Sequence, residues 1–75
     1  MLYLFGLTHY TNFMKRRDLE KRLKKIASKR GESLVIKEGG PHSKVFIGKQ
    51  MITVPRHREI SEMTARAIIK EAENG

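Results

Sequence analysis

The sequence contains no cysteine, and this absence excludes a disulfide scaffold, a thiolate zinc site and thiol catalysis. It fits a reducing compartment, so we expect a cytoplasmic protein. Acidic residues are scarce as well, because 8 Asp and Glu stand against 16 Lys and Arg and leave a formal net charge of +8. Such an excess indicates a polyanionic partner, with nucleic acid favoured over a membrane.

The chain is also short. Its 75 residues leave no room for a cofactor-binding domain beside a substrate domain, and we expect no cofactor. A chain of this size buries only about 60% of the surface that it exposes when unfolded, so its core is marginal. Hydrophobic residues make up 39% of the sequence, which excludes a disordered basic tail. One small folded domain without repeats is expected.

A long hydrophobic run is missing too. Residues 1–13 carry no charge, but their apolar run covers only Leu2 to Leu7. A membrane span needs about 20 apolar residues, and a signal peptide has a basic leader, so neither is expected. We expect residues 1–13 to form a poorly ordered extension and residues 14–75 to form the domain. An upstream start codon, an expression remnant and a short apolar arm all fit this extension, and either Met1 or Met14 fits as the native start.

A first helix is predicted over residues 16–30. Four apolar residues recur at the spacing of one helical face, namely Leu19, Leu23, Ile26 and Ala27. Gly31 supplies a stop signal. Residues 15–30 hold nine Lys and Arg against two acids. The outer face, which includes Lys24 and Lys25, is therefore either a phosphate-binding surface or a solvated helix face.

Beyond this helix the apolar pattern changes to a period of two, which is typical of strands. Three strands are predicted over residues 34–36, 44–47 and 50–54. Gly39-Gly40 and Gly48-Lys49 are hairpin turn signals, so the strands should form an antiparallel meander. The apolar residues expected on its inner face are Val45, Ile47, Ile52, Val54 and either Val35 or the pair Leu34 and Ile36.

A second helix is predicted over residues 62–73. Ser61 is placed to cap its first turn, with Ile60 before it as a hydrophobic staple and Glu62 where the helix dipole favours an acid. The order is then α-β-β-β-α, which is the layout of double-stranded-RNA-binding domains. We expect an α+β two-layer sandwich, with both helices on one face of a three-stranded antiparallel sheet and the other face open.

His42 is the strongest candidate for chemistry. It follows Gly39-Gly40-Pro41 at the start of the second strand, beside a loop with little side-chain bulk. Lys44 and Phe46 share its parity and should project from the same face. Cleavage of an RNA backbone needs such groups, because an imidazole can take the proton of a 2′-OH at neutral pH and cations offset charge on the phosphate. A surface histidine at a strand start is the alternative.

Three further candidates precede the second helix. Arg56 and Arg58 could hold phosphate, and His57 between them is either a phosphate contact, a second acid or an ordinary loop residue. Ser61 is a cap rather than a nucleophile, because no base with a triad pattern accompanies it. No histidine pair or carboxylate stands at metal-ligand spacing, so no metal site is expected.

These elements together resemble the HicA family of mRNA interferase toxins. The resemblance covers residues 14–73 and rests on Gly40-Pro41-His42, on Ile52-Thr53-Val54-Pro55-Arg56-His57 and on the helix ending Ala67-Ile68-Ile69-Lys70. Pro41 departs from the serine that the family often has there, and proline removes a backbone N–H donor.

The resemblance implies a fold like that of double-stranded-RNA-binding domains and ribosome-independent cleavage of mRNA. His42 would be the catalytic residue, and a HicB-like antitoxin would cover it in a toxin–antitoxin complex. The RNA contacts expected beside it are Lys44, Arg56, His57, Arg58, Lys24 and Lys25. A non-catalytic RNA-binding module with the same fold is the main alternative, and a DNA-binding protein is a weaker one because no helix-turn-helix pair is present.

Overall fold

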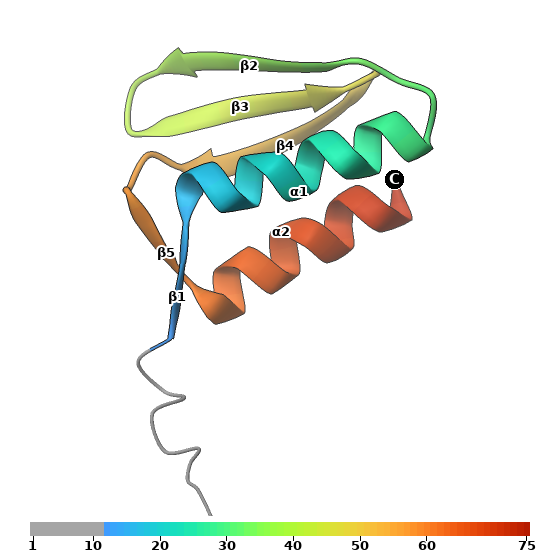
Figure 1. The fold of residues 1–75 in the computed structure, drawn as a ribbon. Coiled ribbons are helices and arrows are strands. Elements are labelled where there is room, and N and C mark those ends of the chain that lie inside the picture. Colours follow the sequence, from blue (N-terminus) through green and yellow to red (C-terminus); the bar gives the residue numbers. More distant parts are fainter. Residues whose placement is uncertain (1–11) are drawn as a thin grey trace, which may run out of the picture.

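The computed structural model describes residues 12–75, which form two helices and five strands (Figure 1). In chain order these are β1 (Phe13–Lys15), α1 (Arg16–Lys29), β2 (Leu34–Gly39), β3 (His42–Ile47), β4 (Gln50–Pro55), β5 (Glu59–Ser61) and α2 (Glu62–Asn74). The extension expected over residues 1–13 lies outside the described residues, except for Asn12 and for Phe13, which begins β1.

The central sheet is the predicted meander. Its strands lie in the order β2-β3-β4, and both neighbouring pairs are antiparallel. Gly40 and Gly48 stand in the two hairpin turns with φ of 70° and 60°. Side chains with a Cβ are strained at such angles, and this explains the glycine at each turn. Each strand extends at one end beyond the range that the apolar pattern indicated.

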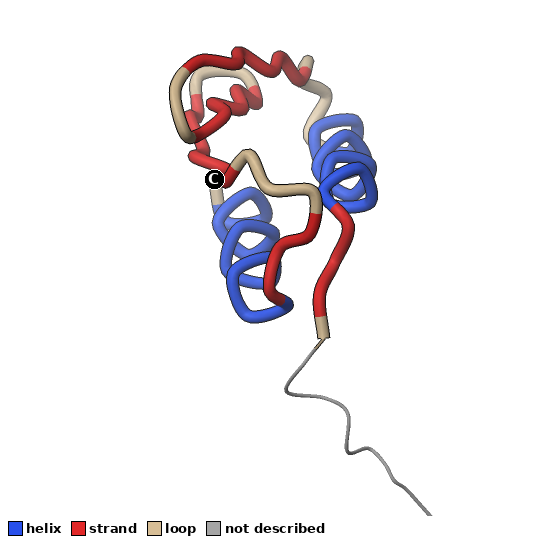
Figure 2. The backbone as a smooth tube through the Cα atoms, turned by 90° about the vertical axis from the view of Figure 1, so that its left-hand side faces the viewer, coloured by secondary structure: helices blue, strands red, loops and turns tan. Residues whose placement is uncertain are grey.

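Both helices cover one face of this sheet, which confirms the predicted α+β arrangement of two layers (Figures 1 and 2). Alternate residues of β3 and β4 are buried beneath the helices, and the residues between them are exposed or half-buried. Leu34 and Ile36 of β2 pack against this core, whereas Val35 is 48% exposed on the opposite face. The buried core residues are Leu19, Leu23, Ala27, Val45, Ile47, Ile52, Val54, Ile60, Ala65, Ile68, Ile69 and Ala72.

The helices begin and end within one residue of their predicted bounds. The Ser61 hydroxyl accepts a hydrogen bond from the Thr64 backbone N–H at 3.3 Å, and Ile60 before it is buried. Ser61 is thus the expected cap of α2. Helix α1 has no side-chain cap; its first backbone N–H, that of Arg16, donates instead to the Arg58 carbonyl at 2.8 Å. Among residues 12–75 no helix is long and apolar enough to cross a membrane.

A second, two-stranded sheet was not predicted. Strand β1 pairs antiparallel with β5, and Met14 lies opposite Ile60. The segment between β4 and α2, for which no strand was predicted, therefore contains one. Each strand has three residues, and that is too short for an alternating apolar pattern to stand out from the neighbouring helix. This β1–β5 ribbon joins the starts of the two helices.

The assignment of the two sheet faces can be tested at adjacent residues of β4. Ile52 is fully buried and Met51 is 48% exposed. Ile52→Ala should lower the free energy of unfolding by about 2–5 kcal/mol because it opens a cavity in the core. Met51→Ala, the matched control, should change it by less than about 1 kcal/mol. Urea denaturation measures both, and equal losses would contradict the assignment.

Candidate functional site

His42 stands at the first position of β3, directly after the β2–β3 turn. It lies between Gly39 of β2 and Pro55 of β4, and its side chain is exposed. Lys44 is also exposed and Phe46 is half-buried, while the residues between them are buried against the helices. The three side chains therefore share the open face, as predicted. An exposed imidazole beside a cation can move a proton close to a bound anion.

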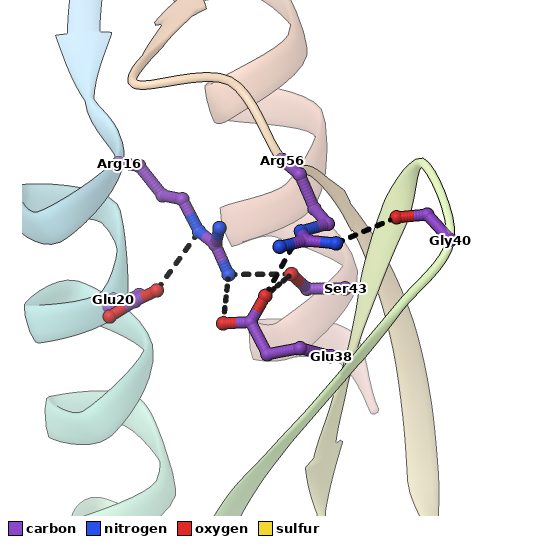
Figure 3. Close-up of polar contacts among 6 residues, drawn as sticks. All are labelled: Arg16, Glu20, Glu38, Gly40, Ser43 and Arg56. Carbon is purple, nitrogen blue, oxygen red and sulfur yellow. Dashed lines mark hydrogen bonds and ion pairs between the residues drawn. The ribbon is translucent and has the colours of Figure 1, made fainter.

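A cluster of polar side chains lies on the other side of this turn, on the helix face of the sheet (Figure 3). Ser43 is fully buried there, next to His42 in the chain. Its hydroxyl accepts a hydrogen bond from Arg16 Nη2 at 2.6 Å and donates one to Glu38 Oε1 at 3.0 Å. Arg16 Nη2 also donates to Glu38 Oε2 at 3.2 Å. The start of α1 is thereby tied to the β2–β3 hairpin.

Arg56 connects the same carboxylate to the turn itself. Its Nε lies 3.1 Å from Glu38 Oε1, and its Nη1 donates to the Gly40 carbonyl at 2.9 Å (Figure 3). Gly40 is two residues before His42, so the Arg56 guanidinium fixes the backbone directly before His42. We call Arg16, Glu38, Ser43 and Arg56 the turn cluster.

Hydrogen bonds and nearby charges favour the ionised form of Glu38. The hydrogen bond from Ser43 lowers the pKa of Glu38 below its ordinary value, and the charges of Arg16 and Arg56 lower it further, whereas partial desolvation opposes them. Arg16 Nε also lies 3.0 Å from Glu20 Oε2, but this contact is an ion pair without hydrogen-bond geometry. Glu38 is therefore a carboxylate that bridges two guanidinium groups.

The other predicted RNA contacts are spread over the surface. Arg58 lines an open groove at the start of α1, where Lys15, two further arginines and three glutamates also line the wall. His57 is exposed in the link between β4 and β5. Lys24 and Lys25 are exposed on α1, in the helix layer. The structure thus places Lys44 beside His42 on the open face. Arg56 contacts the same turn from the helix face, and Lys24, Lys25 and Arg58 also lie on the helix side of the sheet.

Arg16, Glu38 and Ser43 were not singled out from the sequence. One signal was present, because Ser43 has the same strand parity as the buried Val45 and Ile47 and so is a polar residue at an inward position. A buried hydroxyl needs a partner, but the sequence does not show that an arginine from a helix supplies it. Within residues 12–75, no three His, Asp or Glu side chains lie together in a way that could hold a metal ion.

The effect of the turn cluster on stability depends on pH. The folded chain lowers the pKa of Glu38 from its ordinary 4.5, so its stabilisation is present above that pH and is lost as pH falls through the lowered value. At neutral pH, Glu38→Gln should be less stable than the wild type, and this difference should shrink on acidification below pH 4.5. Urea unfolding at a series of pH values measures it.

Glu73→Gln is the matched control, because it removes the same formal charge at the exposed end of α2, away from the turn cluster. The same loss of stability and the same pH dependence in both variants would contradict the role of the cluster.

The chain was also compared with family models, curated proteins and solved structures. No family model, no curated protein and no solved structure matched it.

Proposed function

We propose that this protein is a metal-independent endoribonuclease, an mRNA interferase toxin of a type II toxin–antitoxin system that acts in the stress response. The observation that carries the proposal is the position of His42. Its side chain is exposed on a basic face at the end of the β2–β3 hairpin, and the turn cluster binds this hairpin on the opposite face. The motifs that resemble the HicA family support it. The succession of α1, the three meander strands and α2, to which the short β1–β5 ribbon is added, supports a fold like that of double-stranded-RNA-binding domains.

In the proposed reaction the His42 imidazole accepts the proton of a ribose 2′-OH. The 2′-oxygen then forms a bond to the adjacent phosphorus, the bond from phosphorus to the 5′-oxygen breaks, and the 5′-oxygen takes a proton from the imidazolium or from water. The products are a 2′,3′-cyclic phosphate and a 5′-hydroxyl. General acid–base help of this kind accelerates a reaction by about 10²–10⁴-fold, which suffices for a toxin that needs few cuts per message.

The neighbouring cations would hold the substrate. Lys44 lies two residues from His42 on the same face, about 6.7 Å along the strand, where it can offset charge that grows on the phosphate. Arg56 orders the turn. His57, Arg58, Lys24 and Lys25 would contact the RNA backbone farther from the cut and would supply affinity without base recognition.

Replacement of the imidazole separates an enzyme from a non-catalytic RNA-binding module. His42→Ala should lower the rate of RNA cleavage by about 10²–10⁴-fold and abolish growth inhibition on expression, and it should leave RNA affinity within a few-fold of the wild type. His57→Ala, the matched control, should weaken RNA binding and keep cleavage at saturating RNA. Gel assays of a defined RNA measure both. Undiminished toxicity of a folded His42→Ala protein would refute the catalytic role.

We also propose that a HicB-like antitoxin binds this protein in the cytoplasm, where mRNA is translated, and that it covers His42 in a hetero-oligomer. A partner for a chain with a net charge of +8 should present an acidic surface. Affinity should therefore fall as salt rises, because salt screens the attraction between exposed charges. Calorimetric titration at 50 mM and at 500 mM salt measures this effect. Equal affinity at the two concentrations would show that the interface is not driven by charge.

A further inference from the structure

The open face of the sheet is ordered in rows that cross all three strands. The strand registers place nine residues there, in rows of three. From one end of the sheet to the other the rows are Val35–Phe46–Met51, Lys37–Lys44–Thr53 and Gly39–His42–Pro55. An apolar row, a basic row and the histidine row thus follow one another along β3.

The apolar row is accessible to a ligand. Val35 and Met51 are each 48% exposed, and they flank the half-buried ring of Phe46 on both sides. In the described chain neither helix covers this face, because both pack on the other side (Figure 2). An aromatic ring held between two aliphatic side chains offers a π-surface on which a nucleobase can stack.

The basic row carries two like charges side by side. Lys37 lies directly opposite Lys44 in the antiparallel pair, and like charges at such positions destabilise a sheet. Lys37 Nζ also lies over the Phe46 ring, 5.7 Å from its centroid, so a base that stacks on this side takes the place of the ammonium group. None of the nine residues is acidic. A bound anion would remove the repulsion, so this row is complementary to phosphate.

The apolar row and the basic row together favour single-stranded RNA over an RNA duplex as the ligand of this face. A duplex keeps the faces of its bases inside the stack and offers phosphates and groove edges, so the Phe46 ring would have no base to contact. An extended single strand offers unstacked bases and phosphates together. Rows two residues apart are separated by about 6.7 Å, which places the lysines between the ring and the imidazole.

We infer that the open face is a platform for single-stranded RNA, on which Phe46 stacks a base and Lys37 and Lys44 bind the phosphate that leads to the cleaved linkage at His42. This inference rests on the proposed function, because it names the form of RNA that the same site takes. It assigns Phe46 and Lys37 to substrate binding.

A tryptophan at the platform would report on its occupant. The chain contains no tryptophan, so Phe46→Trp introduces a single fluorophore at the stacking position. In a His42→Ala background, which leaves RNA uncut, a single-stranded oligonucleotide should quench this fluorescence. It should also bind at least tenfold more tightly than the same sequence in a duplex. Phe13→Trp, an exposed position on β1, is the control and should show no quenching.

Affinity variants test the same contacts without a fluorophore. In the His42→Ala background, Phe46→Leu should weaken single-strand binding by about 5- to 150-fold, the range measured for the loss of a base stack. Lys37→Gln should weaken it more than Lys70→Gln, a matched charge loss at an exposed position of α2. Circular dichroism confirms that each variant is folded.

The outcomes distinguish this inference from the proposed function. Absence of quenching, or equal affinity for single strand and duplex, overturns the platform, and loss of cleavage in His42→Ala would still support the endonuclease. Quenching by an antitoxin protein and not by RNA would equally overturn it, because the apolar row would then belong to a protein interface.

Discussion

Both helices cover the same face of a three-stranded sheet, and the remaining features of the molecule follow from this constraint. Within residues 12–75, both helices bury one side of the sheet, and no helix covers the other side. Every second residue of β3 therefore faces the core, and every residue between faces outward. Strand β3 thus contributes Val45 and Ile47 to the core. The same strand carries the candidate catalytic residues His42 and Lys44 on its other side.

The turn cluster links these two sides. Ser43 points inward where the hydrophobic core ends, and its hydroxyl joins an arginine of α1 to the Glu38 carboxylate. Arg56 extends this connection to the Gly40 carbonyl. The backbone before His42 is thereby held by charged groups on the helix face of the sheet, opposite the open face that carries His42. A histidine on a glycine-rich turn would otherwise gain little positional order from its neighbours.

The sequence predicted the meander, both helices, the Ser61 cap and the shared face of His42, Lys44 and Phe46, because each depends on a local period or a local turn signal. It did not predict the β1–β5 ribbon, whose three-residue strands carry no period. It also did not predict the turn cluster, because Arg16 is 22 residues from Glu38 and only the packing of α1 brings them together. The sequence left open whether Val35 or the pair Leu34 and Ile36 packs against the core. The pairing of β2 with β3 places the pair there and leaves Val35 on the open face.

The β1–β5 ribbon has a consequence for how the chain folds. Met14 pairs with Ile60, so the ribbon closes a loop that contains α1 and the whole meander. Pairings between residues so distant in sequence lose entropy on closure and form late compared with hairpins. The meander can therefore assemble first, whereas β1 gains its strand partner only after β5 has been synthesised. During translation, the side-chain partners of Arg16, Glu38 and Ser43, therefore leave the ribosome before Arg58, whose carbonyl accepts the Arg16 backbone N–H.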